Sequence, residues 1–336
     1  MKKLIVLSLP VLFMFIQSAS AKIWRVNNVP GITANFTSAQ AAHNGASAGD
    51  TIYLESSSNS YGDVIVNKKL VWISLGYFLT ENPGLQYHTN TGFINSLTVN
   101  GGADSSTFSI AATGGIYVNS VTNLTFKRCY VNTIFSISGN SNHITINGCY
   151  MNFNNYLNID PATPQLSFTV INNIFNAPIL YIRPNAYQVT FNNNTFNQSP
   201  PNYSVLQIDN ATISNNIFIN CLNGIYYDAG YPSNLNYNTW VGTTNSNYVG
   251  SNNNTFSANF TDVFVGGSST DAKYKLSPTS PAIGSGAGGI DRGAYGGGDP
   301  YVVSQIPAIP SIYQLTVPAN ATGNSLPCSV STRANN

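Results

Sequence analysis

The residues of this sequence best suited to chemistry are four charged ones that recur at one position of an internal repeat: Asp160, Arg183, Asp209 and Asp228. They are conspicuous because only 7% of the 336 residues are charged, where ordinary soluble domains have roughly 25%. In adjacent repeats, two carboxylates such as Asp209 and Asp228 repel one another unless a cation or a hydroxyl-rich ligand lies between them. We therefore expect this position to bind polysaccharide, with Asp209 and Asp228 as candidate Ca²⁺ ligands.

A second polar residue precedes each of these by two positions, on the same face of a predicted strand. Aliphatic residues alternate with both sets, so strand geometry sends the polar residues outward together. Tyr181 and Tyr226 supply flat rings against which sugar faces can pack. The expected ligand-binding residues are Asn158, Asp160, Tyr181, Arg183, Gln207, Asp209, Tyr226 and Asp228. The alternative is a plain ladder of exposed ion pairs, worth about 0.2–1 kcal/mol per pair.

Catalysis by this face has thinner support than binding. A β-elimination lyase needs a basic residue beside carboxylates that hold a uronic acid, usually through Ca²⁺. The candidate catalytic residues are Arg183, Asp209 and Asp228, but no second Arg or Lys is near them in the repeat. The residues therefore favour a polysaccharide-binding protein over an enzyme. Two alternatives stay open: a Ca²⁺-dependent polysaccharide lyase that uses Arg183, and a structural or adhesive surface protein without activity.

The elements that position these residues follow from a repeat of about 22 residues. Each unit alternates apolar and polar residues and then has an Asn-rich turn, with no 3.6-residue period long enough for a helix. Such units bury a core only when they stack. We expect the asparagines of one column to form hydrogen bonds from coil to coil, at a turn with left-handed backbone. That column reads Cys129, Cys149, Asn173, Asn194, Asn216 and Asn238.

The two cysteines of this column and a column of threonines each have alternative interpretations. Cys129 and Cys149 would lie about 5 Å apart in adjacent coils, which suits either a disulfide or two stacked buried thiols. A regular outward threonine column is similar to an ice-binding surface, but its irregular neighbours favour ordinary strand packing. The threonines are Thr125, Thr145, Thr169, Thr190 and Thr212.

The N-terminus predicts export from the cell. Lys2 and Lys3 precede an apolar run of 13 residues and small residues up to Ala21, as in a signal peptide cleaved after Ala21. Such a run is too short to span a bilayer, so we expect no membrane span after its removal. The expected location is secreted, or the outer surface of a Gram-negative bacterium. Nucleic acid is excluded as a partner because there is no basic excess.

The order of short motifs resembles that of a known family. It runs Gly49-Asp50-Thr51-Ile52-Tyr53, Lys68-Lys69-Leu70, Gly76-Tyr77-Phe78-Leu79, Asn-rich coils, Ser280-Pro281-Ala282-Ile283-Gly284 and Asp291 to Gly297. This order resembles the secreted right-handed β-helix proteins of Bacteroidetes, within the pectate-lyase-like superfamily. That superfamily contains lyases, hydrolases, esterases and adhesins, so the resemblance leaves activity undetermined.

The expected fold is all-β. We predict a signal peptide at 1–21 and a right-handed parallel β-helix of about 12 coils at 22–300, with an N-terminal cap. The last coil should end near 280–297. A Pro-containing linker and short closing strands should follow at 301–336.

Overall fold

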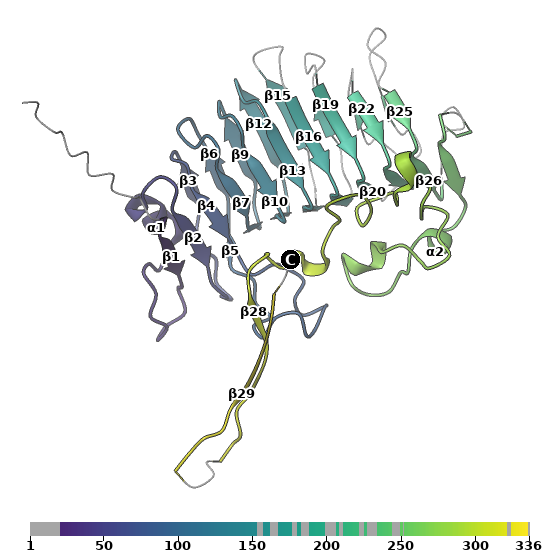
Figure 1. Cartoon of the computed structure of the whole chain (residues 1–336). Coiled ribbons are helices and arrows are strands. Elements are labelled where there is room, and N and C mark those ends of the chain that lie inside the picture. Colours follow the sequence, from purple (N-terminus) through teal and green to yellow (C-terminus); the bar gives the residue numbers. More distant parts are fainter. Residues whose placement is uncertain are drawn as a thin grey trace, which may run out of the picture.

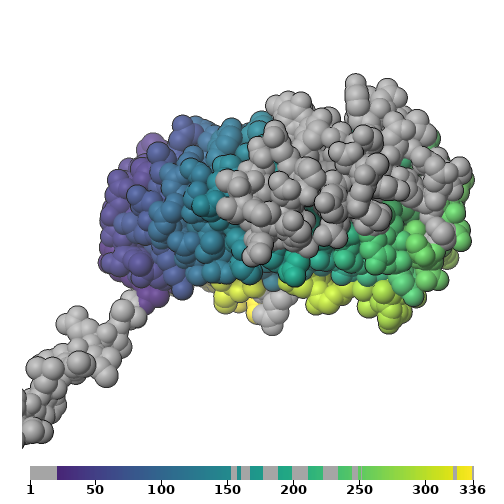
Figure 2. Space-filling model, turned by 90° about the horizontal axis from the view of Figure 1, so that it is seen from above, coloured from purple at the N-terminus to yellow at the C-terminus, as the bar shows by residue number. Residues whose placement is uncertain are grey.

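The computed structural model describes residues 21–152, 157–161, 167–176, 180–182, 188–198, 206–207, 211–221, 225–226, 234–243, 249–250, 252–320 and 324–334. Within them the chain is a parallel β-solenoid, so the predicted all-β fold is confirmed. Each coil adds one strand to each of up to three sheets, and the coils follow one another along a single axis (Figures 1 and 2). The described sheets have ten, nine and eight strands, which does not confirm the predicted twelve coils. The hand of the coil stays a prediction.

Three parallel sheets form the walls of the solenoid. Sheet A contains β1 (Ile23–Val26), β2 (Thr51–Leu54), β4 (Val71–Ile73), β7 (Thr107–Ser109), β10 (Thr125–Lys127), β13 (Ile144–Asn147), β16 (Ser167–Ile171), β19 (Gln188–Asn192), β22 (Ala211–Ser214) and β25 (Asn234–Asn236). Sheet B contains β3 (Val64–Val66), β6 (Leu97–Val99), β9 (Ile116–Asn119), β12 (Phe135–Gly139), β15 (Leu157–Pro161), β18 (Leu180–Ile182), β21 (Leu206–Gln207) and β24 (Ile225–Tyr226). Sheet C contains β5 (Phe93–Ile94), β8 (Ala111–Ala112), β11 (Tyr130–Val131), β14 (Tyr150–Asn152), β17 (Ile174–Asn176), β20 (Thr195–Asn197), β23 (Ile217–Ile219), β26 (Thr239–Val241) and β27 (Thr255–Ser257).

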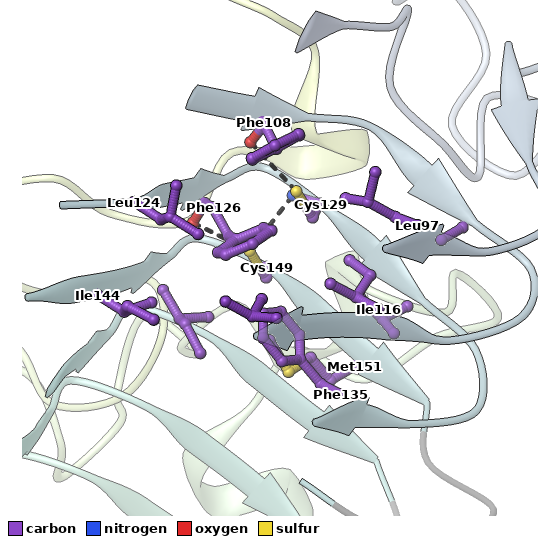
Figure 3. Packing of buried hydrophobic residues seen from close by; sticks show 14 of the residues in the cluster. Leu97, Phe108, Ile116, Leu124, Phe126, Cys129, Phe135, Ile144, Cys149 and Met151 are labelled. Atoms are coloured by element: carbon purple, nitrogen blue, oxygen red, sulfur yellow. Dashed lines mark hydrogen bonds between the residues drawn. The ribbon is translucent and has the colours of Figure 1, made fainter. Parts of the chain in front are cut away.

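The core is a column of apolar side chains inside the coils. In β12, Phe135 and Ile137 are buried while Ser136 between them faces outward, as the period-2 pattern predicts. Rings of successive coils stack inside sheet C, and Phe196 lies 4.8 Å from Phe175 and 4.9 Å from Phe218, centroid to centroid. Figure 3 shows this interdigitation for the earlier coils. Stacking like residues on like residues lets one repeat bury its apolar surface against the next.

The predicted asparagine ladder is confirmed, and it lies in the interior. The side-chain Nδ2 of Asn194 donates to Oδ1 of Asn216 at 3.0 Å, and the backbone N–H of Asn194 donates to the same oxygen at 2.8 Å. Nδ2 of Asn194 also donates to the carbonyl of Val170 at 2.8 Å. The same pattern repeats through Asn173, Asn194, Asn216, Asn238 and Asn254. The ladder thus satisfies the buried polar groups where sheet A turns into sheet C.

The residue before each ladder position has left-handed backbone. Asn172, Asn193 and Asn215 have φ values of 56°, 54° and 58°, which asparagine tolerates well. In the coil after Asn215 the same position is occupied by Tyr237, at φ 57°. A bulky residue is strained there because its Cβ crowds the backbone.

Replacing Tyr237 with asparagine should therefore stabilise the protein by about 0.5–1 kcal/mol. The backbone hydrogen bond from Tyr237 to the carbonyl of Asn252 does not depend on the side chain and should persist. Urea unfolding of Tyr237→Asn measures the change, with Tyr237→Ala as the control that removes the ring without supplying a residue suited to this backbone. An asparagine variant no more stable than the alanine variant would contradict the explanation.

A short helix lies at the N-terminal end of the stack. Helix α1 (Ala39–Gly45) begins at Ser38, whose side chain accepts a hydrogen bond from the backbone N–H of Ala41. It buries Ala39 and Ala42 in the core and contacts β1, β2 and β3. Its role as a cap stays a prediction. Of the helices that the structure describes, none has the length and apolar character that crossing a membrane requires.

After β27 the chain leaves the coils and runs back along the outside of the stack, beneath it in Figure 1. We call residues 258–310 the return segment. It contains helix α2 (Phe260–Val263) and the short 3₁₀ helices η1 (Ala272–Tyr274), η2 (Ala287–Gly289) and η3 (Val303–Gln305). The expected end of the last coil near 280–297 differs from the structure, because these residues lie in the return segment. The prediction was wrong here because a Gly- and Pro-rich sequence is equally compatible with a terminal coil and with a segment that packs on the outside of the coils.

A second core lies between sheet C and the return segment. In β23, Ile217, Phe218 and Ile219 are all buried, because Phe218 points into the coils and its neighbours point into the return segment. The asparagines with left-handed backbone bind the return segment through side-chain hydrogen bonds. Nδ2 of Asn172 donates to the carbonyl of Ala294 at 3.0 Å, and Nδ2 of Asn193 donates to that of Asp291 at 2.7 Å.

The chain ends in an antiparallel hairpin that projects from the body (Figure 1). Its strands are β28 (Ser311–Thr316) and β29 (Ser329–Arg333), which agree with the expected closing strands after a Pro-containing linker. The base of the hairpin joins the early coils, since the backbone N–H of Tyr87 donates to the carbonyl of Ile312 at 2.9 Å.

Candidate ligand-binding face

The backbone pairing of sheet B shows how the first of the predicted polar columns is stacked. Pairing in β9, β12 and β15 places Ser136 beside Tyr117 on one side and Asn158 on the other. The register continues from Asn158 to Tyr181, from Tyr181 to Gln207, and from Gln207 to Tyr226. The backbone therefore stacks six positions in successive strands, and the four predicted ones, Asn158, Tyr181, Gln207 and Tyr226, lie in the order the repeat predicts. Tyr117 is 42% exposed, so at least this ring is open to solvent.

The charged column is described only at its start. Asn119 pairs with Ser138, and Ser138 pairs with Asp160. The next predicted members, Arg183, Asp209 and Asp228, lie outside the described residues. For Asp160, Tyr181, Gln207 and Tyr226 the structure describes the backbone and not the side chain. The ligand-binding and catalytic roles of these residues stay predictions.

A calcium site also stays a prediction. Among the described residues, no group of three or more His, Cys, Asp or Glu side chains lies close enough to hold a metal ion. The two carboxylates predicted to bind Ca²⁺, Asp209 and Asp228, lie outside that part of the chain.

Cys129 and Cys149 lie in adjacent coils, as their shared column predicts, and both are free, buried thiols in this structure. The Cys129 thiol donates to the carbonyl of Phe108 at 3.2 Å, and Sγ of Cys149 accepts from the backbone N–H of Cys129 at 3.3 Å (Figure 3). Burial raises the pKa of the Cys149 thiol well above its usual value. Together the two thiols continue the asparagine ladder, since Cys149 N–H donates to Oδ1 of Asn173 at 2.8 Å.

The threonine column of sheet A is regular along its length. Thr125 pairs with Thr107 and Thr145, and the column continues through Thr169, Thr190 and Thr212. The neighbouring outward column is uneven, and its Lys127 and Asn147 both bind Asp299 of the return segment. One even row beside an uneven, partly covered one fits ordinary strand packing better than an extended ice-binding plane.

A cleft that the repeat does not predict lies at the N-terminal end of sheet A. It lies over Arg25 and Tyr53, which pair in register on β1 and β2. Its walls come from the loop before β5 and from the hairpin base, which are more than 200 residues apart in the chain. Only the isolated aromatic pair Tyr87-His88 in a polar loop hinted at it, and no repeat relates that pair to the rest.

Comparison with known proteins finds neither a matching family model nor a similar curated protein.

Proposed function

We propose that this chain is a secreted, right-handed member of the pectate-lyase-like superfamily that contacts extracellular or cell-surface polysaccharide through the outward face of sheet B. The observation that carries the proposal is the unbroken register of six positions from Tyr117 to Tyr226, which strand alternation puts on one face. With strands about 4.8 Å apart, these positions extend over roughly 24 Å. A row of that length suits an extended polymer better than a small molecule.

The chemistry of the row supports the same ligand class. It alternates phenol rings with hydroxyl and amide side chains: Tyr117, Ser136, Asn158, Tyr181, Gln207 and Tyr226. Rings pack against the apolar faces of sugars, while amides and hydroxyls exchange hydrogen bonds with sugar hydroxyls. The return segment packs against sheet C, so that wall of the solenoid is already occupied.

The alternative is a Ca²⁺-dependent polysaccharide lyase that uses Arg183 as its base. Uronate polysaccharide incubated with the protein and Ca²⁺ would then yield an unsaturated product that absorbs near about 235 nm, by the β-elimination that such a base begins. A flat trace with and without Ca²⁺ would exclude this activity and leave the binding proposal intact.

Replacing Tyr117 with alanine should weaken polysaccharide binding by about threefold to tenfold, because one ring contact is worth about 0.5–1.5 kcal/mol. Affinity electrophoresis in gels that contain plant or bacterial polysaccharides measures this. Tyr313→Ala is the matched control, since Tyr313 lies on the projecting hairpin. Equal retardation of Tyr117→Ala and wild type would remove sheet B as the binding face, and no retardation in any gel would leave a purely structural protein.

A further inference from the structure

The N-terminal cleft on sheet A is separate from the face of sheet B. Two adjoining pockets of about 570 and 320 Å³ share Tyr53, Leu75 and His88. Ligand sites in proteins typically have about 300–1,000 Å³, so each pocket alone is large enough for a ligand. Every lining residue lies in the described part of the chain.

The cleft is held together by contacts between distant segments. The hairpin base is fastened to the loop before β5 by the bond from Tyr87 N–H to the carbonyl of Ile312 and by a second one, from the Arg333 guanidinium to the carbonyl of Leu85 at 2.6 Å. Its floor is a regular sheet, since Arg25 pairs with Tyr53 and Tyr53 with Ile73. A rigid floor with fastened walls gives a largely pre-formed site.

The charges of the cleft neutralise one another. Arg25 and Glu55 are the formally charged residues among those that line it, and they form an ion pair. The second carboxylate oxygen of Glu55 accepts from Nδ2 of the buried Asn27 at 2.8 Å. The hydrogen bond and charge of Glu55 raise the pKa of Arg25. A charged ligand would lose hydration on entering the cleft and would find no unpaired opposite charge there, because Arg25 and Glu55 already neutralise one another. This loss is costly, so the cleft favours a neutral ligand.

The uncharged groups of the cleft suit a molecule rich in hydroxyls. The Tyr87 ring is 47% exposed and meets the His88 ring edge-on, with centroids 5.1 Å apart. Burial raises the pKa of Tyr53 to about 12, so its phenol keeps its proton and can donate. Hydroxyl and amide groups of Ser56, Ser58 and Asn90 also line the cleft. Exposed rings together with small polar groups match the two kinds of surface that a sugar presents.

We propose that this cleft binds a neutral oligosaccharide. One face of a sugar would pack against Tyr87 and His88, and sugar hydroxyls would point toward Tyr53, Ser56 and Ser58. This second site goes beyond the polymer-binding face of sheet B. The cleft would select ligands by charge: it would bind uncharged oligosaccharides and exclude uronates as long as the ion pair between Arg25 and Glu55 is intact.

Isothermal titration with hexasaccharides tests the proposal. The neutral probes are β-1,4-glucan, β-1,3-glucan and β-1,4-mannan hexasaccharides, and hexagalacturonate is the charged probe. We expect at least one neutral probe to bind, and Tyr87→Ala and His88→Ala each to weaken it at least fivefold. Both side chains are exposed, so the variants should fold like wild type, which a thermal melt checks. Tyr313→Ala, on the projecting hairpin, should bind the neutral probe as wild type does.

A second variant tests the charge argument. Glu55→Gln leaves Arg25 without its carboxylate, so this variant should gain binding of hexagalacturonate that wild type lacks, by at least tenfold. Failure of every neutral probe to bind wild type would overturn the proposal, and so would full binding by both ring variants. Hexagalacturonate bound by wild type in the cleft would overturn its selectivity. Loss of binding in Tyr117→Ala but not in Tyr87→Ala would assign the sugar to sheet B and leave only the proposed function.

Discussion

Replacing Asn216 with alanine is expected to lower the free energy of unfolding by about 3–5 kcal/mol, because it removes the middle rung of the buried ladder. Oδ1 of Asn216 accepts both the backbone N–H and Nδ2 of Asn194, at 2.8 and 3.0 Å. Its Nδ2 donates to the carbonyls of Phe191 and Ser214, at 3.0 and 2.9 Å. Alanine removes these four hydrogen bonds in a place that water does not reach. Each buried unsatisfied group costs about 1–3 kcal/mol.

The chain provides its own control for this prediction. A second amide ladder of Asn132, Asn152, Asn176 and Asn197 runs along the half-buried edge of sheet C. Nδ2 of Asn176 donates to Oδ1 of Asn152 at 2.8 Å, but water can replace either group. Asn176→Ala should therefore cost less than about 1 kcal/mol. Urea unfolding of the two variants gives the comparison, and equal losses would show that the interior ladder contributes no more than the outer one.

Replacing Arg292 with alanine should have a comparable effect, about 3–5 kcal/mol, by detaching the return segment from the last coils. Arg292 is 2% exposed, and burial lowers the pKa of its guanidinium. Its described partners are oxygens of carbonyls and hydroxyls. From the coils, the carbonyl of Asn238 accepts at 2.9 Å and Oγ1 of Thr255 at 2.9 Å, while from the return segment the carbonyl of Ser285 accepts at 3.0 Å. One planar cation thus joins β26, β27 and the return segment.

Two further variants separate this role from charge alone. Arg292→Lys keeps the charge but lacks the fork of donors, so it should recover less than half of the lost stability. Arg25→Ala removes an exposed, ion-paired guanidinium and should cost less than about 1 kcal/mol. Thermal melts rank the variants, and limited proteolysis should cut Arg292→Ala first within 258–310. An Arg292→Ala protein with the melting temperature of wild type would refute the joining role.

The solenoid and its interior could be predicted because they repeat. A column such as Asn173, Asn194 and Asn216 is visible in a single sequence, and stacking follows directly from the constant period. The same doublets contain a second signal. The first asparagine of each pair adopts left-handed backbone and binds the return segment, while the second builds the ladder. Only the second role could be inferred from spacing, since the first needs a partner more than 70 residues away.

The return segment could not be placed from sequence because its contacts are long-range and unrepeated. One clue was available. Strand residues Ile217, Phe218 and Ile219 are apolar without alternation, which is typical of a strand buried on both faces. That pattern implies a cover outside the coils, but it does not identify the cover. The cleft at Tyr53 was hidden for the same reason, since its walls at Tyr87 and Ile312 meet only in the folded chain.

The polar face of sheet B could be predicted less completely than the solenoid core but better than the return segment. Its register could be predicted, and pairing of Asn158 with Tyr181 and of Tyr181 with Gln207 agrees. Strand alternation determines which side a residue faces, but it does not determine which ligand, if any, a polar row binds. That choice depends on side-chain geometry at Arg183, Asp209 and Asp228, outside the described residues.

The return segment also changes how the stack can come apart. An array of repeats with neighbour-only contacts opens by fraying, coil by coil, from whichever terminus is weaker. Here Arg292 binds the last coils, while Tyr301 and Asp271 bond to Tyr77 and Asn82 in the loop between β4 and β5. Loss of a coil at the C-terminal end therefore disturbs the same return segment that binds this earlier loop. The protein should accordingly unfold cooperatively, so that the parts of the solenoid joined by the return segment open together or not at all.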